Sequence, residues 1–271
     1  MPEVNASFVG SIPETYDRHL GPVIFEPYAE DLTRRIPAAA KGAVLEVACG
    51  TGILTERLRR ALPSATRLVA TDLNQPMIDY ARDRLGVLPG VEWQAADAAA
   101  LPFPDGSFGA VACQFGVMFV PDKSAAFREA RRVLSRGGVF AFNVWDSLDQ
   151  NPFGQIAHKT IAGFFESDPP TFYLTPFGFY DVTTLREHLA ANDFSGVKVE
   201  KVTLENQSAT ARSFATGLVL GNPVVMAIQE RGLKSEPIID AVEAALVRAG
   251  GDKPFRSKMQ AVVVTATAGA A

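Results

Sequence analysis

The sequence has little cysteine, no long apolar run and no cluster of basic residues. Two cysteines, Cys49 and Cys113, are too few for a disulfide scaffold or a cysteine-rich metal site, and they favour reduced thiols in an intracellular protein. The uncharged runs at 213–229 and 261–271 are shorter than the ~20 apolar residues of a membrane-spanning helix. The first 25 residues lack a basic segment followed by an apolar one, so we expect no signal peptide.

Charge is modest and mixed along the chain. Lys and Arg number 26 and Asp and Glu 30, which gives a net charge of −4. A nucleic-acid-binding surface needs a basic stripe, and the group Arg128, Arg131 and Arg132 is better explained as the solvated face of a helix. With 47% apolar and 21% charged residues, the composition is that of a globular protein with ample material for a core. We expect a soluble, cytoplasmic protein that binds neither nucleic acid nor a metal.

The chain is organised around residues 44–52, an apolar run that contains Glu46 and ends in two glycines, Gly50 and Gly52. The amphipathic stretch 53–58 follows, which indicates a buried strand that turns tightly into a helix. Glycine allows backbone angles that other residues avoid and lets a ligand lie against the main chain. Open α/β sheets bind ligands at such a turn, although two glycines can also mark a turn that only links strand and helix.

Two acids follow at comparable places in the pattern. Asp72 ends a second apolar run 22 positions after Gly50, where an acid in a βαβ unit reaches the hydroxyl groups of a ribose. Asp97 follows a third run at 91–95. The glycine loop and both acids therefore lie at the ends of successive predicted strands, at one edge of the sheet. The alternative for each acid is a helix N-cap, because helical or turn segments follow both.

Strands and helices alternate along the central part of the chain. The predicted strands are 44–48, 67–71, 91–95, 108–114 and 139–145, and the predicted helices between them are 52–61, 75–85 and 122–134. This alternation predicts an α/β protein with a parallel sheet and helices on both faces. Farther along the chain we expect helices at 183–191, 214–231 and 237–249, and strands at 197–204 and 261–267.

Two segments outside this alternation have a different composition. Residues 1–13 are polar and without period, so we predict that they are mobile. The aromatic helical segment that begins at Glu14 is predicted to break at Pro22 and Pro27. After the fifth strand, residues 146–176 are rich in Phe and Tyr. This segment could form a lid over the ligand edge or a satellite core beneath a long connection.

Several of these stretches together resemble the class I S-adenosylmethionine-dependent methyltransferases. They are the glycine loop at 46–52, Asp72, Asp97 and the segment at 132–138 before the fifth strand. The likeness covers residues 40–146 and is nearest to the branch that contains the ubiquinone and menaquinone biosynthesis C-methyltransferases. It implies a Rossmann-like sheet of seven mostly parallel strands with an antiparallel last strand and helices on both faces.

The resemblance also suggests how the chain is organised. We expect an N-terminal helical cap at 1–40 and a methyltransferase domain at 41–271. A helical, aromatic insertion at 146–182, after strand five, is expected to form a lid over the substrate.

The resemblance assigns ten residues to the cofactor S-adenosylmethionine, whose product is S-adenosylhomocysteine. They are Glu46, Ala48, Gly50, Gly52, Asp72, Leu73, Met77, Asp97, Ala98 and Gln114. The glycine loop would bring backbone close to the methionine part, and Asp72 would accept charge-assisted bonds from the two ribose hydroxyls. Leu73 and Met77 would contact the adenine, whose amino group would donate to Asp97. Gln114 would line the site beneath the methyl sulfonium.

The implied activity is methyl transfer from S-adenosylmethionine to a small-molecule acceptor by in-line displacement. Such a transfer needs alignment and exclusion of water, and a dedicated base is not mandatory. No residue is identified as catalytic, and Tyr16 and His19 are weak candidates because their helix could close over the site. The other candidates for removing a proton are His158, His188, Tyr173 and Tyr180.

Other functions stay open at this point. A NAD-dependent dehydrogenase also has an acid after a glycine loop, but residues 50–55 lack its third glycine. A non-catalytic cofactor-binding or interaction protein could have the same fold. Methylation of nucleic-acid bases is disfavoured, because the sequence at 114–117 does not resemble the Asn-Pro-Pro-Tyr motif of those enzymes, and the Asn-Pro-Phe at 151–153 is interpreted as a turn.

Overall fold

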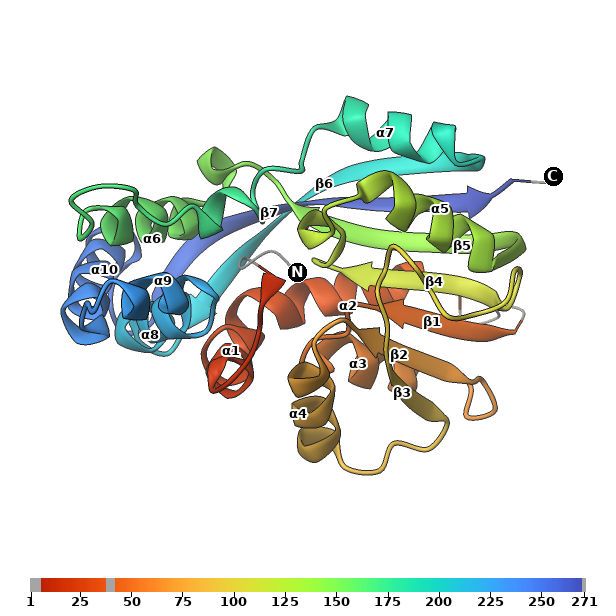
Figure 1. The fold of residues 1–271 in the computed structure, drawn as a ribbon, viewed down its shortest axis with the longest axis horizontal. Coiled ribbons are helices and arrows are strands. Elements are labelled where there is room, and N and C mark those ends of the chain that lie inside the picture. The colour runs from red at the N-terminus through yellow and green to blue at the C-terminus, as the bar shows by residue number, and fades with distance from the viewer. Residues whose placement is uncertain (1–5, 38–41, 270–271) are drawn as a thin grey trace.

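A seven-stranded sheet forms the centre of the computed structural model, which describes residues 6–37 and 42–269 (Figure 1). The strands lie in the order β3-β2-β1-β4-β5-β7-β6, and all neighbours are parallel except β7, which is antiparallel to both β5 and β6. The strands are β1 Ala43–Val47, β2 Leu68–Asp72, β3 Val91–Ala95, β4 Phe108–Gln114, β5 Leu134–Trp145, β6 Phe194–Ser208 and β7 Phe255–Ala268. The predicted fold class is confirmed.

Helices cover both faces of this sheet. Those that flank it are α2 Glu26–Arg35, α3 Ile53–Ala61, α4 Gln75–Leu85, α5 Lys123–Val133 and α7 Val182–Ala191. Helix α2 packs against α3, while α5 packs against α7 in front of the strands in Figure 1. Local sequence fixes where they begin: the carboxylates of Asp122 and Asp181 accept backbone N–H groups and cap α5 and α7.

Strands β6 and β7 extend well beyond their predicted ranges of 197–204 and 261–267. Residues 261–267 of β7 pair with β5, but residues 255–260 pair with β6 alone, so the two strands continue past the sheet as a two-stranded ribbon. Three helices stand between these strands in the sequence: α8 Ala211–Leu220, α9 Val224–Glu230 and α10 Ser235–Gly250. The break between α8 and α9 falls at Asn222-Pro223, inside the range that we predicted as helical.

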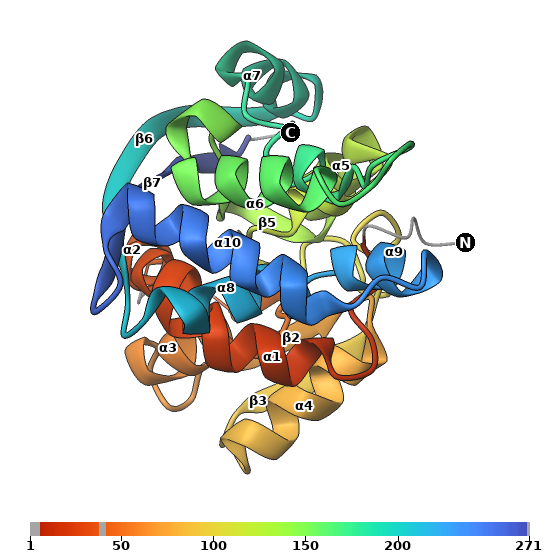
Figure 2. The same ribbon diagram turned by 90° about the vertical axis from the view of Figure 1, so that its left-hand side faces the viewer.

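The helix α6 Pro152–Ala162 joins this group and packs on α8 and α10 (Figure 2). We call α6, α8, α9 and α10 the insertion helices. Helix α6 lies within the predicted insertion at 146–182, whereas α8 to α10 come from the connection between β6 and β7. That the insertion forms a lid over the substrate stays a prediction. The boundary that we predict between residues 40 and 41 lies outside the described residues.

The N-terminal region is more ordered than predicted. Helix α1 begins at Ile12 rather than at Glu14, and both Ile12 and Pro13 are buried. The prediction that residues 1–13 are mobile is therefore wrong for the last two of them. Residues 1–5 lie outside the described ranges. Helix α1 (Ile12–His19) is followed by the π-helical turn η2 (Gly21–Phe25) and then by α2. The segment therefore forms three pieces, since both prolines stand in first turns, where a missing N–H is tolerated.

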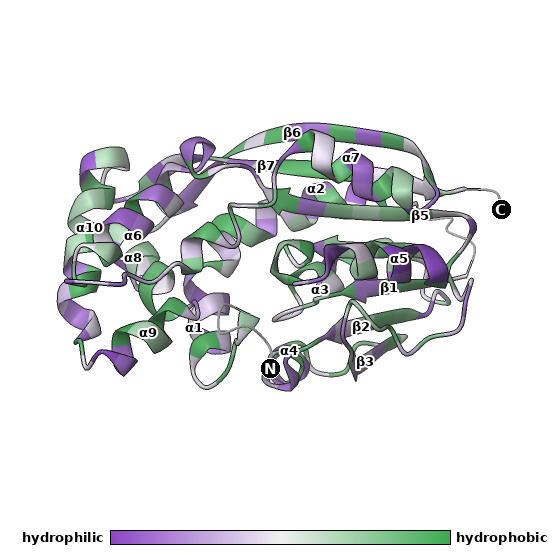
Figure 3. Ribbon diagram, turned by 45° about the horizontal axis from the view of Figure 1, so that its top comes forward, coloured by the Kyte–Doolittle hydropathy of each residue, from purple (hydrophilic) through white to green (hydrophobic). Residues whose placement is uncertain are grey.

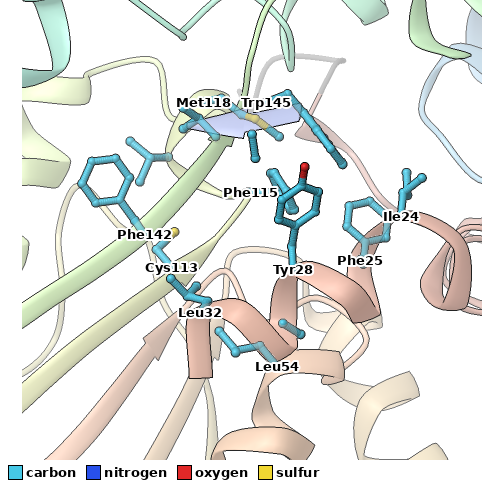
Figure 4. Packing of buried hydrophobic residues seen from close by; sticks show 14 of the residues in the cluster. Ile24, Phe25, Tyr28, Leu32, Leu54, Cys113, Phe115, Met118, Phe142 and Trp145 are labelled. Carbon is cyan, nitrogen blue, oxygen red and sulfur yellow. The ribbon is translucent and has the colours of Figure 1, made fainter. Parts of the chain in front are cut away.

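Aromatic side chains dominate the core between α2 and the sheet. Tyr28 contacts Phe115 and Trp145 edge to face, with both pairs of ring centroids 5.4 Å apart, and points toward them in Figure 4. Along the edge strand β6, hydrophobic and hydrophilic residues alternate (Figure 3). Both cysteines are free and buried. Within the described ranges, no single helix is long and apolar enough to cross a membrane. The bent pair of α8 and α9 could do so together, by length and composition only.

Candidate functional site

A cavity of about 450 Å³ opens at the carboxyl ends of β1, β2 and β4. We call it the main cavity. Eight of the ten residues assigned to the cofactor line it: Ala48, Gly50, Asp72, Leu73, Met77, Asp97, Ala98 and Gln114. They come together because these strands are parallel, so the turns that follow them meet at one edge.

Asp72 ties the second strand to the glycine loop. Its Oδ2 accepts the backbone N–H of Gly50 at 2.9 Å, and its Oδ1 accepts that of Asn74 at 2.8 Å. Burial raises the pKa of Asp72, and these backbone donors oppose the rise. The N-cap position of α4 belongs to Asn74, so Asp72 is not the helix cap that we considered as its alternative. Oδ1 also accepts Asn74 Nδ2 in a long bond of 3.4 Å. Oδ2 therefore keeps a further lone pair for a hydroxyl of a ligand, and Oδ1 can accept a second hydroxyl in place of this long bond.

One wall of the main cavity is apolar, and an acid stands beside it. Leu73 is 50% exposed, which is unusual for a large apolar side chain, whereas Met77 is buried. Asp97 is exposed, and its Oδ1 accepts the N–H of Ala99 at 2.8 Å, which fixes the turn after β3. No helix follows Asp97 directly, so the N-cap alternative is wrong here too.

Glu46 lines a small recess of about 30 Å³ instead of the main cavity, and Gln114 and Gly50 line both. Burial raises the pKa of Glu46 to about 8, and the nearby Asp72 adds to the rise. Within the described part of the chain, Glu46 Oε2 and Gln114 Oε1 are buried without a hydrogen-bond partner. The nitrogen of the Gln114 side-chain amide is held in place, because Nε2 donates to the carbonyl of Phe25 at 3.0 Å. Two unpaired acceptor oxygens make the recess suited to a cationic donor.

Gly52 has a structural position rather than a place in the cavity wall. Its φ of +81° is the left-handed conformation that glycine adopts freely, and it forms the N-cap of α3. A Cβ at this position would lie 2.7 Å from Leu85 Cδ1 and 3.2 Å from Ala81 Cβ. Gly52 thus packs against α4, and the contact of its backbone with the cofactor that the resemblance implies stays a prediction.

Backbone strain gathers where β1 and β4 end. Ala48 and Phe115 have φ values of 56° and 52°, in a region that side chains rarely adopt, and both line the main cavity. Between them lies Gly116, where a Cβ would collide with Ala48 and lie 2.8 Å from Cys113 Sγ. The sequence pattern indicated Gln114 but not Phe115 and Gly116. The reason is that neither a positive φ nor a close approach of two residues leaves a periodic pattern in the sequence.

A second, much smaller cavity of about 50 Å³ adjoins the main cavity. We call it the aromatic chamber. Its lining is mostly aromatic: Phe8, Tyr16, Leu20, Ile24, Phe25, Phe115, Met118, Phe119, Trp145, Phe153, Phe172, Tyr173, Pro176, Phe177, Leu218 and Asn222. Four of these residues also line the main cavity, namely Phe8, Tyr16, Phe115 and Phe119. Phe8 belongs to the stretch that we predicted to be mobile, and nothing in its local sequence indicates its contacts.

The two weak catalytic candidates are placed differently. Tyr16 lines the main cavity, the recess and the aromatic chamber, and its ring stacks on Phe25 at 4.5 Å. Burial, together with Asp72 and Asp17, holds the pKa of Tyr16 well above its ordinary value, so its hydroxyl stays protonated. His19 lies outside the lining of these cavities, with Nδ1 2.9 Å from the hydroxyl oxygen of Ser213 on α8.

This strand order, with a cavity beside the turn after the first strand, is that of the Rossmann-like methyltransferase fold. Residues 45–142, which run from β1 into β5, match the family model described as "Methyltransferase domain".

Sequence relatives cover the same region. The ubiquinone/menaquinone biosynthesis C-methyltransferase UbiE of Hahella chejuensis is 41% identical over 102 residues, which are 36% of this chain and 41% of that protein. The chain therefore spans about two fifths of the length of this curated relative.

Solved structures extend the likeness in fold to most of the chain. A phosphoethanolamine N-methyltransferase 2 of Haemonchus contortus, in complex with phosphomonomethylethanolamine and S-adenosylhomocysteine, has a TM-score of 0.59 at 14% identity and covers 95% of this chain and 57% of its own. The [4+2]-cyclase SpnF has a TM-score of 0.58 at 19% identity, and the match covers 91% of this chain and 81% of the cyclase chain. At these identities the likeness shows the fold alone.

Proposed function

We propose that this protein transfers the methyl group of S-adenosylmethionine to a small-molecule acceptor. The observation that carries the proposal is the buried Asp72 carboxylate, fixed by the Gly50 amide at the end of β2, inside the region that matches the methyltransferase domain. The [4+2]-cyclase has the same fold, so the assignment depends on these side chains and not on the fold.

The residues present fit this cofactor. Asp72 can accept both ribose hydroxyls, and the exposed Leu73 offers an apolar surface to the adenine, with Asp97 in reach of its amino group. The unpaired oxygens of Glu46 and Gln114 suit the ammonium of the methionine part, because a buried acceptor without a donor is costly. When bound, the cofactor would supply an electrophilic methyl carbon: as the acceptor atom forms its bond to this carbon, the carbon–sulfur bond breaks and sulfur keeps the electron pair.

The protein's own contribution is alignment and exclusion of water. The rings of Phe8, Tyr16, Phe115 and Phe119 lie between the main cavity and the aromatic chamber, where an acceptor would approach. No carboxylate, imidazole or ammonium of the described chain lines this chamber. The chamber therefore supplies no base, which agrees with a transfer that needs none.

Isothermal titration with S-adenosylmethionine, S-adenosylhomocysteine and NAD tests the proposal. We expect micromolar binding of the first two ligands and a loss of at least about 100-fold in Asp72→Asn, since two charge-assisted bonds are removed. Asp97→Asn should lose less, because Asp97 is exposed. Binding of NAD alone would overturn the proposal in favour of a dehydrogenase. If none of the three ligands binds, the proposal is overturned in favour of a partner-binding module.

A further inference from the structure

We infer that the acceptor is an uncharged, flat and largely apolar compound, which binds in the aromatic chamber with one polar group directed to Asn222 and Tyr173. This inference rests on the proposed function. It concerns residues that lie mostly outside the matched region 45–142, in the N-terminal helices and the insertion helices.

The chamber is placed where an acceptor must bind. The main cavity, at about 450 Å³, has the size of a site for one cofactor-sized ligand. The chamber adjoins it at Phe115, directly after Gln114, whose amide oxygen faces the recess. A molecule in the chamber is therefore separated from the main cavity only by the side chains that line both.

The lining of the chamber disfavours a charged molecule. Among its described residues none carries a charge, so a buried ion would lose its hydration without gaining a partner. Aromatic faces can hold a cation, but here rings cover one another. Phe115 stacks on Trp145 at 4.0 Å with an interplanar angle of 12°, and Tyr16 stacks on Phe25 at 4.5 Å. A flat apolar ring can join such an arrangement, edge to face or in offset stacks.

One end of the chamber is polar. The Tyr173 hydroxyl donates to the carbonyl of Leu218 at 2.7 Å, and Asn222 Nδ2 donates to the same carbonyl at 3.2 Å. Both side chains are buried and both line the chamber. Asn222 Nδ2 also donates to the carbonyl of Gly217, at 3.5 Å, so both amide hydrogens are engaged. The Asn222 amide oxygen and the Tyr173 oxygen can still accept, so a hydroxyl of a ligand can donate there.

The volume of the chamber indicates which wall moves. About 50 Å³ is little more than the space of one water molecule, so a ring must displace a side chain. Phe8 is half-buried and precedes α1 on a segment without strand or α-helix, whereas Phe115 and Trp145 are buried in the core. We assign the entry of the acceptor to the side of Phe8.

The test uses the full chain saturated with S-adenosylhomocysteine and three probes of one shape. They are 2-naphthol, 2-naphthoate and 2-naphthylmethylammonium, and binding is followed by calorimetry and by quenching of tryptophan fluorescence. We expect 2-naphthol to bind at least tenfold more tightly than either ion. Tighter binding of the ammonium or of the carboxylate would overturn the inference. Failure of all three probes on protein that binds S-adenosylhomocysteine would overturn it too, and would leave the chamber as core packing.

Variants locate the probe. Asn222→Leu should weaken 2-naphthol about tenfold but leave 2-methylnaphthalene and S-adenosylhomocysteine unchanged, because the ligand loses its polar contact while the apolar walls and the cofactor site stay. Tyr173→Phe should act in the same direction, and Tyr180→Phe, on the exposed side of the chain, is its matched control. Equal losses for both probes in Asn222→Leu would overturn the polar assignment. A protein that fails to bind S-adenosylhomocysteine contradicts the proposed function itself and, with it, this inference.

Discussion

Asn74 connects Phe8 to the carboxylate of Asp72. The backbone N–H of Phe8 donates to Asn74 Oδ1 at 3.4 Å, and Asn74 Nδ2 donates to the carbonyl of Ala6 at 3.1 Å. The backbone N–H of Asn74 donates in turn to Asp72 at 2.8 Å. One side chain thus holds the N-terminal segment over the main cavity, next to the group that we propose for the ribose.

We expect Asn74→Ala to release this segment. Loss of the two hydrogen bonds to the N-terminal segment, each of which contributes about 1 kcal/mol, should weaken binding of S-adenosylhomocysteine by up to about 30-fold. It should also speed proteolysis before α1. Calorimetry and limited proteolysis measure the two effects. Gln75→Ala, whose amide bonds only to Asp79 within α4, is the control. If the two variants behave alike, Asn74 does not hold the segment.

Glu46 should make the ligand-free protein less stable as pH rises. Its pKa is raised to about 8, so between an ordinary glutamate pKa and that value the folded protein holds one more proton than the unfolded chain. The free energy of unfolding then falls by about 1.4 kcal/mol per pH unit.

Glu46→Gln should remove this slope. Relative to wild type, we expect it to gain about 3 kcal/mol between pH 5.5 and 7.5 in urea unfolding. The exposed Glu187→Gln provides the comparison. A wild-type slope that Glu46→Gln does not change would show that Glu46 ionises normally.

Gly116→Ala should damage both stability and the cavity. Its Cβ would meet Ala48, whose backbone is already strained, so we expect a loss of about 1–3 kcal/mol and markedly weaker cofactor binding. Thermal unfolding and titration measure these effects. At Gly163 a Cβ would make only ordinary contacts, the nearest at 3.4 Å, so Gly163→Ala should be nearly neutral. Equal stability of the two variants would contradict the close approach at Gly116.

Tyr28→Phe tests the link between α2 and β6. The Tyr28 hydroxyl donates to the carbonyl of Val202 at 2.9 Å from a fully buried ring. Removal of this hydroxyl should cost about 1–2 kcal/mol in chemical unfolding, because the carbonyl loses its donor, and should leave cofactor binding intact. A change in binding without a change in stability would be the contrary result.

The parts that could be predicted from the sequence are those with a local signal. The apolar period, Gly50 and Asp72 indicated strand, turn and acid, and parallel pairing then placed them at one edge. Phe8 could not be predicted, because its position depends on Tyr16 and Phe119, whose rings it meets edge to face at 5.9 and 5.8 Å. The length of the ribbon formed by β6 and β7 could not be predicted either, because residues 255–260 pair with a strand that is far away in the sequence.

That ribbon makes the protein modular. The residues proposed for the cofactor belong to the parallel part of the sheet, whereas α8, α9 and α10 stand at the end of an arm that two strands carry past it. Residues 209–254 thus form one continuous insertion between two strand ends, and their main contacts with helices elsewhere in the chain are with α1 and α6. We expect an altered acceptor preference to arise from changes in this insertion, with the proposed cofactor site left as it is.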